Sequence, residues 1–291
     1  MIRHTVRTRD GRLLNVEEGG HKGGKPVFAL HGTPGSILLY GPHVSDASKR
    51  GIRLISYDRS GYGGSSRHPG RKVADAAKDV KAIADTLGFE RFAIWGISGG
   101  GPHALACAAL LSHRVVAAAS LASPAPYPSP GLDWLSNMGE DNVSEFKAAM
   151  AGPEQLSQFL EPRRAELLKA TPREMAQLWE SILPPVDKAV LAGKLGRSLA
   201  SSLKKGLRTG YEGWKDDDLA FVSDWGFEPS DVSVPLLLWQ GKRDKMVPFA
   251  HGKWLAEHIK GVEARLSPDD GHLTLFERRV PETHAWLLKH F

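Results

Sequence analysis

The chain of 291 residues contains a single cysteine, Cys107, and no long apolar run. One thiol can form neither an internal disulfide framework nor a cysteine-based zinc site. It lies in the small apolar stretch 104–111, which predicts a buried, unreactive thiol. No apolar run approaches the roughly 18 residues of a membrane helix. Residues 1–12 are basic and polar and lack the apolar core of a signal peptide, so we expect a cytoplasmic protein with no membrane segment.

The chain also lacks a strong excess of charge of either sign. Lysine and arginine number 38 and acidic residues 33, for a net charge of +5, and the cations are scattered without a dense basic run. We therefore expect no nucleic-acid partner. The hydrophobic share of 41% and charged share of 24% exclude a disordered or fibrous chain. A chain of this length buries about three quarters of its unfolded surface, so it needs no metal or disulfide to hold a core.

Short apolar runs alternate with helical patterns in the first 121 residues. Two runs flank the turn Asp10-Gly11, which indicates a hairpin. Strands alternating with helices predict an α/β fold, with a mostly parallel central sheet flanked by helices. The expected strands are 2–7, 13–17, 27–30, 52–57, 92–95, 115–121, 236–239 and 262–266. The expected helices of this series are 73–87, 102–111, 250–259 and 281–291.

A long helical stretch interrupts this series. The proline-rich segment 124–130 ends regular structure, and the sequence that follows, to about residue 231, has a helical pattern. One start inside it is well marked, because Thr171-Pro172-Arg173-Glu174 has the pattern of a capping box. We predict a core formed by residues 1–123 and 232–291, with a helical cap at 124–231 inserted into it.

The strongest chemical motif is Gly96-Ile97-Ser98-Gly99-Gly100, between a predicted strand and a predicted helix. G-x-S-x-G in this setting is typical of a nucleophile elbow. A sharp strand-to-helix turn holds the serine in a strained conformation and presents its hydroxyl at the end of the sheet. Small neighbours avoid clashes in such a turn. Ser98 is therefore the candidate nucleophile.

The same region carries a competing motif. Gly99, Gly101 and Ala104 fit the glycine pattern of a dinucleotide loop. That loop requires an acidic residue about 20 positions later, to hold the ribose. Residues 119–124 contain none. We therefore expect no nucleotide cofactor.

A serine needs a base, and the base needs an orienting acid. Asp244 follows the predicted strand 236–239, and His272 follows the strand 262–266. Open α/β sheets place their sites at these carboxyl ends. Asp269 and Asp270 are competing acids in the histidine loop, where we expect them to shape the turn.

An oxyanion hole requires two N–H donors. Gly99, directly after the serine, supplies one. The second is expected from the loop 31–36, which follows an early strand. Pro34 has no N–H, so Thr33 is the candidate donor, while the direction of its hydroxyl stays open. We interpret His31 as a structural support of this loop.

Taken together, 31–35, 58–66, the serine motif, Asp244 and His272 resemble the α/β-hydrolase family. The resemblance is strongest to capped bacterial carboxylesterases, which are related to proline iminopeptidases, cofactor-free haloperoxidases and C–C bond hydrolases. It implies the chain order serine, acid, histidine found here, a supporting role for 58–66 at the site entrance, and no metal or organic cofactor. Family members with an aspartate nucleophile, such as epoxide hydrolases, are disfavoured by the serine.

The predicted cap contains aromatic and charged residues that could either bind substrate or serve the structure alone. Trp134, Trp179 and Trp214 are tentative substrate-binding residues, although aromatic residues at helical spacing are more often core. The run Lys215-Asp216-Asp217-Asp218 could bind a substrate amine, but we expect a solvated helix start.

The sequence thus predicts a serine hydrolase of small carboxylic esters, acting through Ser98, His272 and Asp244 and an acyl-enzyme. Proline iminopeptidase, lactonase, C–C hydrolase and perhydrolase activities use the same residues and stay open. A non-catalytic ligand-binding protein of this fold is the alternative of another class. The natural substrate and the oligomeric state are left open.

Overall fold

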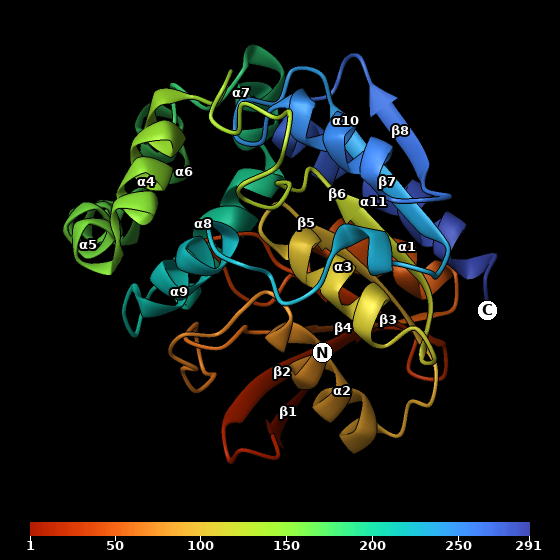
Figure 1. Ribbon diagram of the computed structural model, residues 1–291. Helices are drawn as coiled ribbons and strands as arrows, with labels where there is room; N and C mark the ends of the chain where they lie inside the picture. Colours follow the sequence, from red (N-terminus) through yellow and green to blue (C-terminus); the bar gives the residue numbers. More distant parts are fainter.

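An eight-stranded sheet forms the centre of the protein, in a computed structural model that describes residues 1–291 (Figure 1). The strand order is β1-β2-β4-β3-β5-β6-β7-β8. β1 and β2 form the predicted antiparallel hairpin, β2 pairs antiparallel with β4, and all other neighbours are parallel. The mostly parallel sheet is therefore confirmed. The strands are β1 (Ile2–Arg7), β2 (Leu13–Gly20), β3 (Lys25–Leu30), β4 (Ile52–Tyr57), β5 (Phe92–Ile97), β6 (Val115–Leu121), β7 (Leu236–Gly241) and β8 (Glu263–Ser267).

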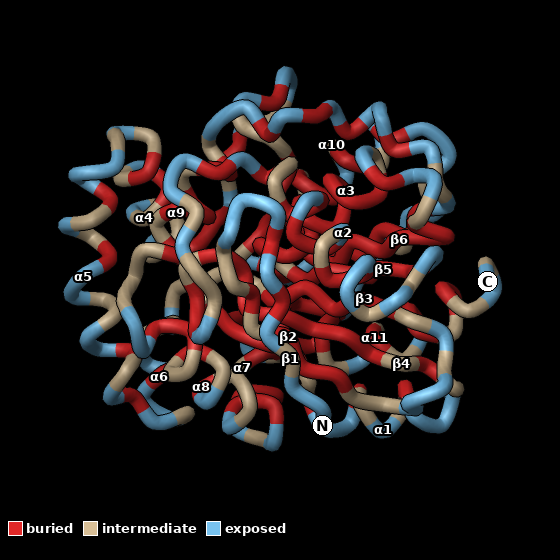
Figure 2. Tube along the Cα trace, turned by 90° about the horizontal axis from the view of Figure 1, so that it is seen from below, coloured by how far each residue is buried: buried red, intermediate tan, exposed pale blue.

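Helices cover both faces of the sheet. Those on one face are α2 (Asp75–Leu87), α3 (Gly100–Leu110) and α10 (Phe249–His258), and those on the other are α1 (Gly41–Lys49) and α11 (His272–Leu288). Figure 2 shows the inner strands, such as β5 and β6, as buried, while the exposed segments lie at the periphery. None of the helices is long and apolar enough to cross a membrane.

The central strand β5 shows why these residues form a buried parallel strand. All six of its residues are buried, and Trp95 and Phe92 are among the largest fully buried side chains. A strand covered on both faces reads as a continuous apolar run rather than an alternating one. Burying each side chain of this size contributes roughly 1.5–3 kcal/mol. Cys107 is buried on α3, as predicted.

Between β6 and β7 the chain forms only helices. This helical insert (residues 124–231) gathers at one side of the sheet in Figure 1. The capping box at Thr171 is present, with its hydroxyl accepting from the Glu174 N–H at 3.3 Å. The boundaries of the cap stay a prediction. The helices are α4 (Glu140–Ala151), α5 (Pro153–Lys169), α6 (Pro172–Leu178), α7 (Pro185–Leu191), α8 (Lys194–Gly206), α9 (Glu212–Phe221) and the short η1 (Pro229–Asp231).

The expected start of the closing helix was wrong. The helix predicted for 281–291 begins at His272 and contains Pro281 inside it. A proline removes the hydrogen bond to the carbonyl four residues earlier, here Glu277. His43 Nε2 lies 3.4 Å from that carbonyl oxygen and offers a partner, so the helix continues through the proline. Helix α1, which contains His43, was not predicted.

The acidic run 216–218 is also not solvated, which corrects the preferred sequence interpretation. All three aspartates are at most 4% exposed, because α9 packs between the core and α4. Asp216 pairs with Arg67 at 2.8 Å, and Asp217 lies between two buried arginines. Asp218 has no donor from any protein nitrogen or hydroxyl. Three neighbouring acids therefore have three different environments.

Candidate active site

Ser98 occupies the turn between β5 and α3 in a strained conformation. Its φ of 54° lies in the left-handed region, which non-glycine residues rarely adopt. The Ser98 N–H donates to the Leu121 carbonyl at 2.8 Å, which ties the turn to the neighbouring strand β6. A Cβ at position 96 would lie 2.0 Å from the Gly100 carbonyl oxygen, so the turn requires glycine there. Strain of this kind persists where surrounding structure enforces it, and it clusters at functional sites.

His272 and Asp244 meet although 28 residues separate them. His272 Nδ1 lies 2.8 Å from Asp244 Oδ2. The other oxygen of Asp244 accepts from the N–H groups of Met246 and Val247 at 2.8 and 2.9 Å. These bonds fix the carboxylate and leave His272 Nε2 free of a protein partner. An imidazole held in this way can accept a proton at Nε2.

The surroundings of His272 favour its protonated form. Burial lowers its pKa, but the charge of Asp244 and the hydrogen bond to it prevail, with a further contribution from Asp187. The pKa of His272 is therefore raised above its ordinary 6.5. A base of this strength accepts a proton from a hydroxyl more readily than a free imidazole does.

Asp187 of α7 is a residue that sequence reasoning missed. Its carboxylate is fully buried and accepts from the His272 N–H at 2.7 Å and the Thr274 N–H at 2.8 Å. It thereby caps the N-terminus of α11, where a negative charge is favourable. The local signal, an acid after Pro184-Pro185, indicates a helix start only. Nothing in it points to a histidine 85 residues later.

The two candidate oxyanion donors lie next to each other. A Cβ at Gly99 would lie 2.2 Å from Thr33 Oγ1, so the two residues are in contact. Neither the Thr33 N–H nor the Gly99 N–H has a hydrogen-bond acceptor within the protein. The Thr33 hydroxyl is already committed, because it donates to Asp217 at 2.6 Å. The backbone groups, and not this hydroxyl, are the available donors.

A buried ion cluster holds the loop that carries Thr33. Arg59 donates to the carbonyls of His31 and Gly32 and, at 2.6 Å, to Asp217. Asp217 also pairs with Arg71 at 2.6 Å. Burial raises the pKa of Asp217, but the two guanidinium charges prevail and hold it well below its usual range. The cluster thus joins α9 of the insert to the loop that carries Thr33.

His31 is neutral within this cluster. Its Nε2 accepts from the Arg59 N–H at 3.1 Å, and its Nδ1 faces the Gly32 carbonyl at 2.8 Å. Burial, followed by the charge of Arg59, lowers its pKa well below the ordinary value. These contacts agree with a structural support of the loop.

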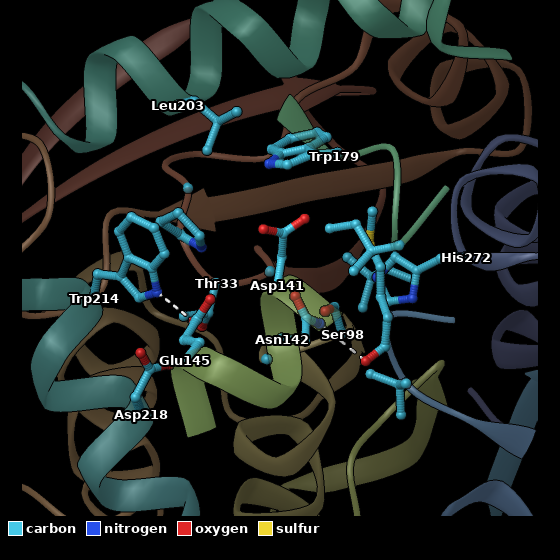
Figure 3. A pocket seen from close by; sticks show the side chains of 18 of the residues that line it. Thr33, Ser98, Asp141, Asn142, Glu145, Trp179, Leu203, Trp214, Asp218 and His272 are labelled. Carbon is cyan, nitrogen blue, oxygen red and sulfur yellow. Dashed lines mark hydrogen bonds between the residues drawn. The ribbon is translucent and has the colours of Figure 1, made fainter. Parts of the chain in front are cut away.

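One cavity of about 180 Å³ contains Ser98 and His272 in its wall (Figure 3). It lies between the sheet core and the insert. An apolar cavity of about 150 Å³ already accommodates benzene, so this one has room for a short acyl or aryl group. The three tentative tryptophans all line it, together with other apolar residues from the insert: Trp134, Trp179, Trp214, Met138, Phe146 and Phe159.

The cavity also has polar lining, of which the sequence indicated only Asp218, as part of the less favoured interpretation of the run 215–218. Glu145 and Asp141 of α4 and Asp218 of α9 contribute carboxyl groups to its wall. The indole N–H of Trp214 donates to Glu145 at 2.7 Å. Only the relative rotation of α4 and α9 brings these groups to one cavity. A helical pattern in the sequence cannot specify that rotation.

Comparison with known proteins finds related chains that match this sequence over most of its length. A family model described as alpha/beta hydrolase fold matches residues 25–279. The AB hydrolase superfamily protein YisY of Bacillus subtilis is 27% identical over 95% of this chain and 94% of its own. The bifunctional esterase/perhydrolase DCH of Acinetobacter calcoaceticus is 26% identical over 96% of this chain and 94% of its own.

Among solved structures, a thermophilic esterase from Thermogutta terrifontis has a similar fold. It superposes with a TM-score of 0.69 at 21% identity and covers all of both chains. At this identity the likeness concerns the fold.

Proposed function

The chain belongs to the α/β-hydrolase family and is a hydrolase, and from that premise we propose that it cleaves small carboxylic esters with Ser98 as nucleophile. The observation that carries the proposal is the His272–Asp244 contact of 2.8 Å in the wall of the cavity that also contains the strained Ser98. A serine with an oriented base is the requirement for nucleophilic catalysis.

In the proposed mechanism, Ser98 Oγ attacks the ester carbonyl carbon while its proton passes to His272 Nε2. The N–H groups of Thr33 and Gly99 stabilise the negative oxygen of the tetrahedral intermediate. Asp244 orients the imidazole and stabilises its cation. The intermediate collapses, the alcohol leaves with the proton from His272, and Ser98 remains acylated.

Water then repeats the sequence on the acyl-enzyme. His272 accepts a proton from the water as it attacks, and returns that proton to Ser98 Oγ as the carboxylic acid leaves. Both steps are acyl transfers. Every proton that moves is carried by Ser98, His272, the alcohol or the attacking water. The esterase activity that names the relative from Acinetobacter supports an ester over other acyl substrates.

The first prediction tests the nucleophile with p-nitrophenyl butyrate. The wild-type protein should release p-nitrophenol, and Ser98→Ala should lose turnover by a factor on the order of 10⁴ or more. The matched control is Ser201→Ala, the same substitution at an exposed position of α8. It should retain wild-type activity.

Labelling provides an independent readout. A fluorophosphonate should add one phosphonyl group to the wild-type protein and to Ser201→Ala, and none to Ser98→Ala, as measured by intact mass. Equal turnover in wild type and Ser98→Ala would overturn the proposed nucleophile. Labelling without ester turnover would redirect the search to lactones or amides, which share the first step.

A further inference from the structure

Two carboxyl groups lie close to each other in the cavity wall. Glu145 from α4 and Asp218 from α9 form this carboxyl pair, and each side chain is close enough to shift the pKa of the other. Asp218 is fully buried, and no protein nitrogen or hydroxyl donates to either of its oxygens. Glu145 has one other partner, the indole N–H of Trp214 at 2.7 Å. Figure 3 shows the three side chains together in the cavity wall.

No cation of the protein neutralises the carboxyl pair. Arg71 is committed to Asp217 at 2.6 Å. Arg163 is committed to Asp141 at 3.1 Å and to Glu166 at 3.2 Å. Buried carboxylates are normally compensated by a cation, a metal or several donors, and an uncompensated one is costly. The wall therefore presents acceptor capacity that the protein leaves unused.

The carboxyl pair lowers its own negative charge by keeping a proton. Burial raises the pKa of Glu145 to about 7, and burial together with the Glu145 charge raises that of Asp218 well above its usual range. Two neighbouring carboxyl groups cannot both ionise easily, so the pair favours forms that keep at least one proton. A cation that reaches them can displace that proton to solvent and stabilise the second charge.

We propose that the carboxyl pair is a binding subsite for a protonated amine, so that the favoured substrates are esters whose acyl or alcohol part carries an ammonium group. The inference rests on the proposed function and deepens it. An ammonium has three donors, and the pair offers acceptors that no protein donor occupies. Trp214, held beside Glu145 by its indole N–H, lines the same cavity and adds an aromatic ring, a group that attracts cations.

The first test uses the wild-type protein and two small ions of equal carbon number. n-Butylammonium chloride should inhibit p-nitrophenyl acetate hydrolysis competitively. At equal ionic strength, the inhibition constant of sodium butyrate should be higher by a factor of about ten or more. Titration calorimetry on Ser98→Ala should show the same order of affinities without any turnover. Equal affinities, or tighter binding of butyrate, would overturn the subsite.

The second test assigns the effect to the carboxyl pair. The substrates are methyl 6-aminohexanoate and methyl heptanoate, which differ by an ammonium in place of a methyl group. The ratio of their kcat/KM values should fall about tenfold in Asp218→Asn and in Glu145→Gln. Glu161→Gln, at an exposed position of α5 outside the cavity, removes the same charge and should leave the ratio unchanged.

The outcomes separate the subsite from the proposed function. Hydrolysis of p-nitrophenyl acetate with no preference for the cation would leave the esterase proposal standing and reject the subsite. A folded variant with an unchanged ratio would indicate that the pair only ties α4 to α9. If a variant fails to unfold cooperatively in a thermal melt, the wild-type inhibition decides.

Discussion

At the scale of single residues, the contact between His272 and Asp244 sets the pH at which the proposed base, His272, is available. In the proposed mechanism, protonated His272 cannot accept the proton of Ser98, so the proposed activity requires the neutral imidazole. Because Asp244 raises the pKa of His272 above 6.5, the loss of activity on acidification should begin at a higher pH than for a free imidazole.

We therefore predict that kcat/KM for p-nitrophenyl butyrate falls on the acid side with a midpoint above 6.5. In Asp244→Asn the midpoint should move to lower pH, since burial alone lowers the pKa of His272. Turnover should fall by a factor on the order of 10⁴. A pH–rate series from pH 4 to 9 measures both effects.

The matched control is Asp269→Asn, an exposed acid of the histidine loop. It should change neither the midpoint nor the turnover. A variant at Asp269 as impaired as the one at Asp244 would instead make the loop acid the partner of the histidine.

The position of a whole element, helix α11, depends on one carboxylate of the insert. Asp187 accepts three hydrogen bonds, from the His272 N–H and from the N–H and hydroxyl of Thr274. An asparagine at this position would present an N–H₂ group to a backbone N–H. The first turn of α11 would then shift, and His272 is its first residue.

For Asp187→Asn we predict a loss of about 1–3 kcal/mol in the free energy of unfolding, measured in urea. The value of kcat should fall about 10–100-fold, because small displacements of the proposed base, His272, are costly. The acid midpoint should move to lower pH, because the negative charge of Asp187 contributes to the raised pKa of His272.

The shift of the midpoint separates a positioning role from simple loss of stability. Asp133→Asn is the control, since Asp133 is an exposed aspartate of the insert. It should leave kcat, the midpoint and the stability as they are. An unchanged midpoint in Asp187→Asn would reject the electrostatic part of this role.

At the scale of the whole molecule, the cluster around Asp217 joins the insert to the core. Two buried arginines, Arg59 and Arg71, depend on this one carboxylate. Removing one partner of a buried pair leaves an uncompensated charge, at a cost of about 3–5 kcal/mol. Since Arg59 also donates to the His31 and Gly32 carbonyls, in the loop that carries Thr33, the loss should reach the proposed active site.

Asp217→Asn should therefore lower the free energy of unfolding by about 3–5 kcal/mol, measured in urea at pH 7. The folded pKa of Asp217 is depressed, so its stabilising contribution is present above the unfolded pKa of about 3.9 and is lost as the pH falls below it. The variant should lack this part of the acid destabilisation.

Asp224 also lies in the insert and forms an exposed pair with Lys72 of the core, so Asp224→Asn is the control. Its unfolding curve should stay close to wild type, because exposed ion pairs are screened by water. Similar losses in the two variants would show that burial is not the cause.

The features that could be predicted from the sequence are those that depend on local signals. The glycine-flanked Ser98, the apolar strand β5 and the capping box at Thr171 each depend on neighbours within a few residues, and these features were predicted. The closing helix was misplaced because Pro281 reads as a start. The carbonyl that the proline frees has a partner in α1, 234 residues away along the chain.

The sequence by itself determined the α/β alternation, the strained serine turn and the chain order of the serine, acid and histidine. These follow from backbone sterics and hydrophobic periodicity, which act over a few residues. Only the tertiary structure decided that Asp187 holds the histidine, that Asp217 holds the Thr33 loop 184 residues away, and that the carboxyl pair shares one cavity. The physical reason is that a buried acid is specified by its partners in space, and the packing of the insert on the sheet determines those partners.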